Sequence, residues 1–105
     1  MTFGRIIRDQ RKKLGMSQKR LAERIKKEDG ASISPQYLND IEFDRRGPPT
    51  YIIDQLAEVL QMPGDNLYLL AGQMPSDLRE TPYDSARFEK AFQAFRRELK
   101  RGRHG

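Results

Sequence analysis

The chain of 105 residues contains no cysteine and a single histidine. Without cysteine it can form neither a disulfide framework nor a thiolate metal site. The histidine, His104, stands in the arginine-rich tail, so the sequence offers no histidine-based zinc site and no Ser-His-Asp triad. A glycine-rich loop that could cradle phosphates is also missing. We therefore expect no metal, no cofactor and no enzymatic activity.

Long hydrophobic runs are missing too. Hydrophobic residues make up 36% of the chain and charged residues 33%. No apolar run approaches the ~20 residues that a bilayer-spanning helix needs. The N-terminus enters an amphipathic pattern at once, without the apolar stretch of a signal peptide. We expect one small cytoplasmic domain that does not enter a membrane, with at most an appended terminal element.

Positive charge is concentrated at the two ends of the chain, whose net charge is +5. Residues 1–20 carry seven basic residues against one acidic residue, and residues 87–105 carry seven against two. Residues 49–86 hold one basic residue, Arg79, against six acidic ones. This asymmetry is typical of a protein that offers one face to a polyanion. The solvated faces of ordinary helices would produce a similar pattern, so charge alone does not decide between these readings.

Apolar residues recur at helical spacing, and no stretch alternates with a period of two for long enough to form a strand. Thr2 is expected to cap a first helix that ends at Gly15, and Ser17 to cap a second. The apolar face of the first helix comprises Phe3, Ile6, Ile7 and Leu14, and that of the second comprises Leu21, Ala22 and Ile25.

Later start signals complete an all-α fold. Ser34-Pro35 combines an N-cap hydroxyl with proline at the first helical position and begins a third helix. Thr50 opens a fourth helix, and a fifth follows Pro63. The sequence predicts five helices within residues 1–72, a linker over 73–83, and a C-terminal amphipathic helix with a basic tail over 84–105.

Separated motifs in this chain resemble the lambda-repressor/Cro-like helix-turn-helix family. Residues 11–22, RKKLGMSQKRLA, are similar to the family signature R-x-x-x-G-x-[ST]-Q-x-x-L-A, and residues 34–42, SPQYLNDIE, resemble its recognition helix. Residues 46–60 are similar to the loop and helix that follow. The resemblance covers about two-thirds of the chain, residues 3–72. It implies a DNA-binding transcriptional regulator.

The resemblance also implies which residues would contact bases. The recognition helix of this family enters the major groove by its N-terminal part, and the corresponding residues are Ser34, Gln36, Tyr37, Asn39 and Asp40. Glutamine can bond adenine in a bidentate manner, and aspartate can accept from the amino group of cytosine. Plainer roles remain open: Ser34 as a cap, Tyr37 as a core residue and Asp40 as a solvated carboxylate.

Phosphate contacts are implied on both sides of this helix. Ser17, Gln18 and Lys19 begin the second helix, where N–H groups and the helix dipole favour an anion. Arg45 and Arg46 follow the recognition helix, where they would lie along the sugar-phosphate wall. Both groups could also be ordinary solvated helix ends.

Two further points come from the comparison with the family pattern. Arg11 and Glu42 match its internal ion pair, with two independent surface charges as the alternative. Between Ala22 and Ser34 the chain is about six residues longer than the usual tight turn, and we expect residues 26–32 to extend the second helix. This leaves the angle of the recognition helix open. Lys26 and Lys27 would either contact phosphate or be exposed.

The last predicted helix carries a stripe that is too apolar to stay exposed to solvent on an isolated helix. Dimerisation through this stripe is the leading expectation, because such regulators bind near-palindromic operators with two recognition helices. Packing on its own domain is the alternative. The residues of the stripe are Phe88, Phe92, Phe95 and Leu99, with Ala91 between them.

The function predicted from these observations is a double-stranded DNA-binding transcriptional regulator that acts as a repressor. An antitoxin-type autoregulator, whose last helix binds a protein partner, is the alternative from another class. A third alternative is a nucleic-acid-binding domain that binds through its positive charge alone. It would bind without sequence preference at fixed salt.

Overall fold

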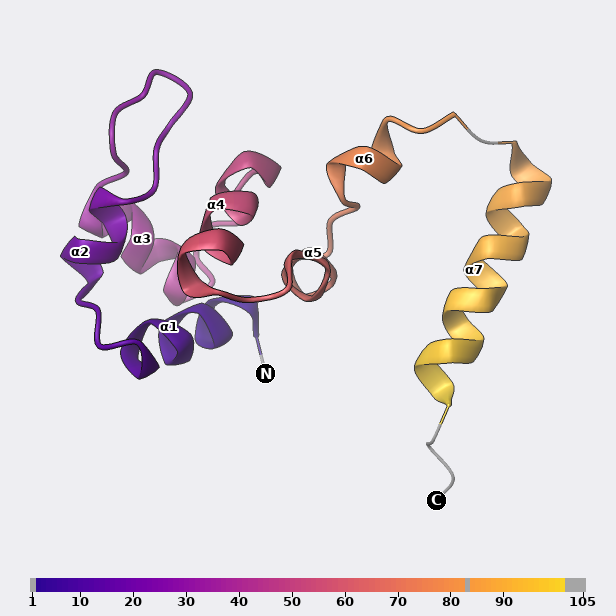
Figure 1. The fold of residues 1–105 in the computed structure, drawn as a ribbon, viewed down its shortest axis with the longest axis horizontal. Helices are drawn as coiled ribbons and strands as arrows, with labels where there is room; N and C mark the ends of the chain where they lie inside the picture. The colour runs from indigo at the N-terminus through magenta and orange to yellow at the C-terminus, as the bar shows by residue number, and fades with distance from the viewer. Residues whose placement is uncertain (1, 83, 102–105) are drawn as a thin grey trace.

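The computed structural model describes residues 2–82 and 84–101. The tail that holds His104 lies outside these residues. Within them the regular elements are helices, as Figure 1 shows, which confirms the all-α prediction. They are α1 (Phe3–Lys13), α2 (Gln18–Glu23), α3 (Pro35–Glu42), α4 (Thr50–Leu60), α5 (Gly64–Ala71), α6 (Ser76–Arg79) and α7 (Ser85–Lys100).

Hydroxyl and carboxylate caps begin the helices where the sequence predicted them. The Thr2, Ser17 and Ser34 hydroxyl oxygens each accept a hydrogen bond from the backbone N–H three residues later, and the Asp84 carboxylate does the same for α7. Each cap satisfies one of the N–H groups that a helix start leaves without a partner. Gly15, at φ +74°, ends α1 in the left-handed region that glycine favours.

Helix α1 packs against three other helices of the bundle. These are α3, α4 and α5, while α2 packs on α3 and α4 on α5. Leu14, which was predicted on the apolar face of the first helix, lies at the surface with 38% of its area exposed. The fully buried apolar side chains are Ile7, Leu21, Ile25, Leu38, Ile41, Ile52, Ile53, Leu56, Leu60 and Leu67.

The connection between α2 and α3 differs from the prediction. It does not extend α2, which ends at Glu23, but folds back as a short hairpin over residues 25–33. An antiparallel β-bridge joins Lys26 to Ser32, and the Ile33 N–H donates to the Ile25 carbonyl at 2.9 Å. Gly30 turns the tip at φ +86°, a conformation that stops a helix. Figure 1 shows this hairpin projecting beyond the bundle.

Side chains hold this hairpin in place. The Gln55 amide pairs with the backbone of Lys26 as a neighbouring strand would, accepting from its N–H at 2.7 Å and donating to its carbonyl at 2.8 Å. The Lys26 ammonium donates to the Glu23 carbonyl at 2.9 Å and so completes the end of α2. Lys26 is therefore engaged within the protein. The prediction that Lys26 or Lys27 contacts phosphate stays open, because both side chains are exposed.

The charge at the tip of the hairpin influences Tyr51 on α4. Partial burial raises the pKa of the Tyr51 phenol above its ordinary value, and the carboxylate of Glu28 at the tip raises it further. Tyr51 thus lies close enough to the tip to be affected by its charge.

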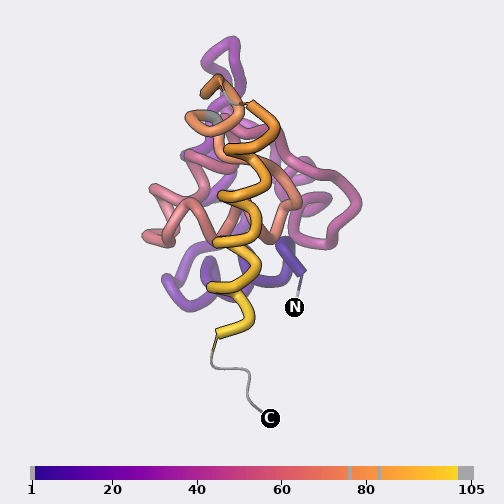
Figure 2. The backbone as a smooth tube through the Cα atoms, turned by 90° about the vertical axis from the view of Figure 1, so that its right-hand side faces the viewer, coloured from indigo at the N-terminus to yellow at the C-terminus, as the bar shows by residue number. Residues whose placement is uncertain are grey.

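The segment after α5 includes one helical turn, α6, inside the stretch predicted as a linker. Beyond it, α7 stands to one side of the bundle in Figure 1 and crosses in front of it in Figure 2. None of its described residues is buried. The structure therefore does not show the alternative in which the stripe packs on its own domain. Exposed fractions are 41% for Phe88, 43% for Phe92, 45% for Phe95 and 53% for Leu99.

Candidate nucleic-acid interface

The outer face of α3 presents polar side chains near its N-terminus. Gln36 is exposed, and its amide donates to an Asp40 carboxylate oxygen at 3.0 Å. The same carboxylate oxygen accepts from Nε of Arg45 at 3.1 Å. Asp40 therefore holds the side chains of Gln36 and Arg45 in place. The alternative of a merely solvated carboxylate did not include this role. The Ser34 hydroxyl accepts from the Tyr37 N–H at 3.0 Å and acts as the helix cap.

Tyr37 and Asn39 lie at the margin of this face, and both are half-buried. The Tyr37 ring packs against the core, and the guanidinium carbon of Arg46 lies 4.5 Å from its centroid. The aromatic ring thus serves the core on one side and holds a cation near α3 on the other.

Gln18 connects α2 to α3. Its amide nitrogen donates to Oδ1 of Asn39 and to Oε1 of Glu42, both at 3.0 Å. Both amide hydrogens are thereby used inside the protein, and the side chain is half-buried. Its neighbours Ser17 and Lys19 are exposed, and Ser17 caps the helix.

Arg11 and Glu42 form a two-pronged ion pair between α1 and α3. Nε of Arg11 donates to Oε2 of Glu42 at 2.6 Å, and Nη2 donates to Oε1 at 3.0 Å. The remaining Nη1 donates to the Met16 carbonyl at 2.8 Å. The side chains are only 8% and 0% exposed. Because the charges and lone pairs of both groups are satisfied, this pair can be held in a low-dielectric interior.

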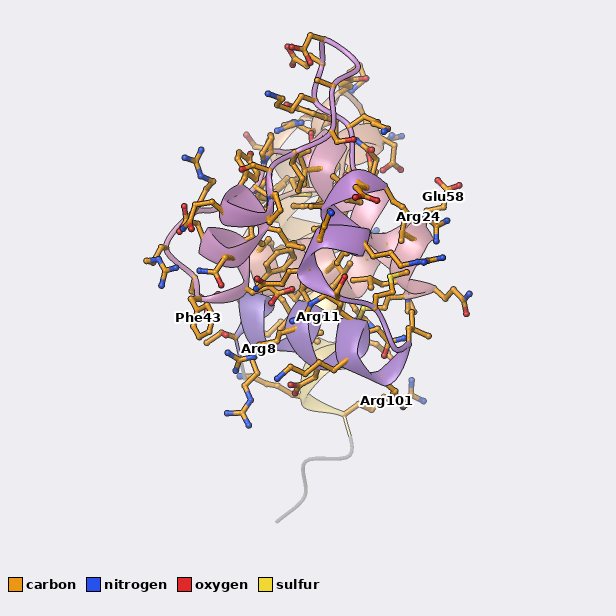
Figure 3. All side chains as sticks on the ribbon, turned by 90° about the vertical axis from the view of Figure 1, so that its left-hand side faces the viewer. Arg8, Arg11, Arg24, Phe43, Glu58 and Arg101 are labelled. Atoms are coloured by element: carbon orange, nitrogen blue, oxygen red, sulfur yellow. The ribbon has the colours of Figure 1, made fainter. Side chains whose placement is uncertain are left out.

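Sequence reasoning missed Phe43 and Arg8. Phe43 follows α3 directly and exposes 49% of its area. The guanidinium carbons of Arg8 and Arg45 lie 4.8 Å and 5.3 Å from its ring centroid. Figure 3 shows Arg8 and Phe43 beside each other at the edge of this face, with Arg11 further inside. Spacing was the available signal, because Gly4, Arg8 and Arg11 fall on one face of a helix.

Gly4 and Asp44 set the distance between α1 and α3. A Cβ atom at Gly4 would lie 2.4 Å from the Ile41 carbonyl oxygen, so the helices meet too closely there for any side chain. The Gly4 N–H donates to a carboxylate oxygen of Asp44 at 2.9 Å. Asp44 stands at φ +59°, two residues after the end of α3. These contacts position the last turn of α3 on the first turn of α1.

A family model described as helix-turn-helix matches residues 7–67, more than half of the chain. The matched region runs from α1 into α5 and contains the two helices whose geometry is described above. The chain belongs to the lambda-repressor/Cro-like helix-turn-helix family. No curated protein and no solved structure gives a significant match to it.

As a helix-turn-helix protein of this type, the chain is a DNA-binding transcriptional regulator. The family is not typically enzymatic. Residues 2–82 and 84–101 contain no cluster of three histidine, cysteine, aspartate or glutamate side chains suited to a metal ion. None of the helices described there is long and apolar enough to cross a membrane.

Proposed function

We propose that this regulator is a cytoplasmic, sequence-specific repressor that inserts the N-terminal part of α3 into the major groove of an operator. The observation that carries the proposal is the exposed polar face of α3, bordered by Lys19 at the start of α2 and by Arg45 and Arg46 after α3. A polar ridge with cations on both sides suits a groove walled by phosphates. A regulator bound in this way represses by occupying its operator.

Gln36 is the proposed base-reading residue. Its side chain is exposed, and Asp40 orients its amide with a 3.0 Å hydrogen bond. An oriented glutamine amide carries the donor and the acceptor that the major-groove edge of adenine requires. Asp40 can accept from cytosine, and Ser34, Tyr37 and Asn39 complete the proposed contact surface.

Phosphate contacts are assigned to Ser17, Gln18 and Lys19 on one side and to Arg45 and Arg46 on the other. They position the protein without reading sequence. Gln18 has both amide hydrogens bonded to α3, so a side-chain contact to phosphate requires it to exchange one of these bonds. Its backbone N–H can bind without such a change.

Selection of bound sequences from random double-stranded DNA would define the operator, and variants then test the division of roles. Gln36→Ala should lose ~1–3 kcal/mol of discrimination at one base position. Gln18→Ala should weaken all sequences alike. Gln93→Ala, an exposed glutamine on α7, controls for loss of an amide elsewhere.

Binding would be titrated on a panel of single-base operator variants at fixed salt. A uniform loss for Gln36→Ala would show that this residue does not read a base. Equal affinity of the unaltered protein for every sequence would instead favour the general nucleic-acid-binding alternative.

The proposed active form is a homodimer joined through the α7 stripe of Phe88, Phe92, Phe95 and Leu99, bound to a near-palindromic operator. The exposure of all four side chains along one helix supports this proposal. The antitoxin-type alternative uses the same stripe for a different protein. It would be favoured by a stoichiometric partner that copurifies with the chain and is lost when the stripe is altered.

A further inference from the structure

The side chains of Arg8, Phe43 and Arg45, here called the Phe43 cluster, lie at the C-terminal end of α3, whereas Gln36 lies near its N-terminus. Phe43 directly follows α3 and leaves 49% of its area exposed. Two guanidinium carbons lie within 5.3 Å of its ring centroid. Both cations therefore gather on one ring although they come from different elements.

Tertiary contacts bring Arg8 to this place. It lies one helical turn after Gly4, which touches the backbone of the last turn of α3, and one turn before Arg11, which pairs with Glu42 on α3. The Gly4 N–H is bonded to Asp44, the residue that follows Phe43. Arg8 is thus held between two fixed points of the α1–α3 contact.

Arg45 is connected to the proposed base-reading residue. Its Nε forms an ion pair with Asp40 at 3.1 Å, while 53% of its side chain stays exposed. The same Asp40 oxygen accepts from Gln36 at 3.0 Å. A shift of Arg45 would therefore displace the Asp40 carboxylate that orients the Gln36 amide.

We propose that the Phe43 cluster binds the phosphate backbone of DNA, with Arg8 as a further phosphate ligand beside Arg45, which is already assigned to phosphate above, and with Phe43 as the positioning residue. An arginine stacked on an aromatic ring uses the face of its guanidinium, which leaves its in-plane N–H groups free to donate to phosphate oxygens. The inference rests on the proposed function, because it places the phosphate beside the groove that α3 enters.

The charge of the cluster favours phosphate over an apolar partner. It carries two cations, and the single carboxylate in an ion pair with it, among the described residues, is Asp40. A protein partner docking on Phe43 would have to cover both guanidinium groups, which is costly without further acceptors.

Salt-dependent DNA binding tests this site. The association constant for operator and for unrelated DNA would be measured over a range of salt concentrations. A variant that no longer neutralises one phosphate has a slope of log K against log salt that is shallower by about 0.9. Arg8→Ala should show this change and lose about tenfold in affinity on both DNAs, since binding to a phosphate carries no sequence information.

Arg5→Ala is the matched control. It removes the same charge from the same helix. Among the described residues, the Arg5 guanidinium forms an ion pair with Asp9 alone, at 3.8 Å on the exposed surface. Its slope should equal that of the unaltered protein. Arg8→Lys keeps the charge but not the planar stacking group, so it should keep the slope and lose part of the affinity.

Phe43→Ala tests the positioning role without removing a charge. It should weaken binding to both DNAs about two- to fivefold, because each exposed cation–π contact contributes ~0.5–1 kcal/mol. Phe43→Tyr keeps the ring and should restore the affinity. Circular dichroism would verify that each variant is folded.

Three results would overturn the inference. The first is an unchanged slope for Arg8→Ala, and the second is an unchanged affinity for Phe43→Ala. The third is a loss for Phe43→Ala at particular base steps only, which would mean that the ring touches bases. In each case the unaltered protein still binds its operator, so the proposed function stands. Failure of the unaltered protein to prefer any sequence would overturn the proposed function instead.

Discussion

The buried ion pair between Arg11 and Glu42 links α1 to α3 through a single carboxylate that also accepts from Gln18. Three helices therefore converge on Glu42, which is 1% exposed. Removing either member of the pair leaves the other charge buried without its partner.

We predict that Arg11→Ala and Glu42→Ala each lower the free energy of unfolding by ~3–5 kcal/mol. The double variant should lose less than the sum of the two, because the second substitution removes the stranded charge. Urea denaturation of the four proteins measures the coupling. Additive losses would mean that the two side chains contribute independently.

Gly4 is the second residue on which the α1–α3 contact depends. Within a helix, replacing glycine by alanine usually stabilises by ~1 kcal/mol. Gly4→Ala should have the opposite sign and destabilise by ~1–3 kcal/mol, because its Cβ would meet backbone atoms of Ile41 and Glu42 at 2.4–2.7 Å.

Gly64→Ala provides the control for this sign. Gly64 also lies in a helix, but its added Cβ would meet only the Ala57 Cβ at 3.9 Å, an ordinary contact. Thermal and urea unfolding should show it neutral or slightly stabilised. A Gly4→Ala protein that is as stable as the control would show that α1 can move away from α3 at little cost.

At the scale of elements, the 25–33 hairpin replaces the tight turn that usually joins α2 to α3. It places Ile25 and Ile33 in the core at its base and leaves its polar tip outside. Since Ser34 follows at once, the hairpin determines where α3 begins. Its attachment to α4 therefore matters for the position of the proposed DNA-binding face.

Gln55→Ala should loosen the hairpin while leaving the helices folded. The variant loses both hydrogen bonds to the Lys26 backbone, which should lower stability by ~1–3 kcal/mol. Hydrogen exchange should become faster at the Lys27 and Ile33 N–H groups, which are bonded across the hairpin.

Gln93→Ala, on the exposed α7, should leave exchange at these groups unchanged. Equal protection in Gln55→Ala and in the unaltered protein would show that the hairpin is stable by its own backbone bonds. Operator affinity, measured on the same samples, reports whether α3 moves when the hairpin loosens.

At the scale of the whole molecule, one half-site offers few contacts to a single short helix. Joining two copies makes the second DNA contact effectively intramolecular, and affinity rises without new chemistry. The basic α7 and the acidic stretch of residues 49–86 are complementary in charge. This complementarity would bring α7 of one copy near the other copy. The exposed apolar stripe of α7 is the surface through which we expect the two copies to associate.

Phe92→Glu combined with Phe95→Glu would place two charges in that interface. The variant should be a folded monomer with weak operator binding, because buried unpaired charges are strongly unfavourable. Light scattering and operator titration measure both properties. By helical spacing, Gln93 and Ala94 point away from the stripe, so Gln93→Glu with Ala94→Glu adds the same charge and should remain dimeric.

A Phe92→Glu/Phe95→Glu protein that stays dimeric and binds normally would contradict the assignment. The interface would then lie on α4 and α5, and α7 would have another role.

Features that depend on near neighbours were readable from the sequence. Helix starts at Thr2, Ser17 and Ser34 follow from a hydroxyl that bonds an N–H three residues away, and the core follows from apolar spacing within one helix. The motifs in residues 11–22 and 34–42 were sufficient for the family. These signals are local or belong to a recurring pattern, so no tertiary contact was needed to read them.

Tertiary structure alone decided the features that depend on distant partners. Gln55 pairs with Lys26 across 29 positions and Asp44 with Gly4 across 40. Residues 26–32 were predicted to be helical. No signal near them in the sequence indicates that Gln55, the partner that holds them as a hairpin, lies beside them. For the same reason, the sequence did not predict the hydrogen bonds of Gln18 or the contact of Arg8 with the Phe43 ring. Hydrogen bonds and cation–π contacts require atoms within a few ångströms, and only the packing of α1, α3 and α4 brings these atoms together.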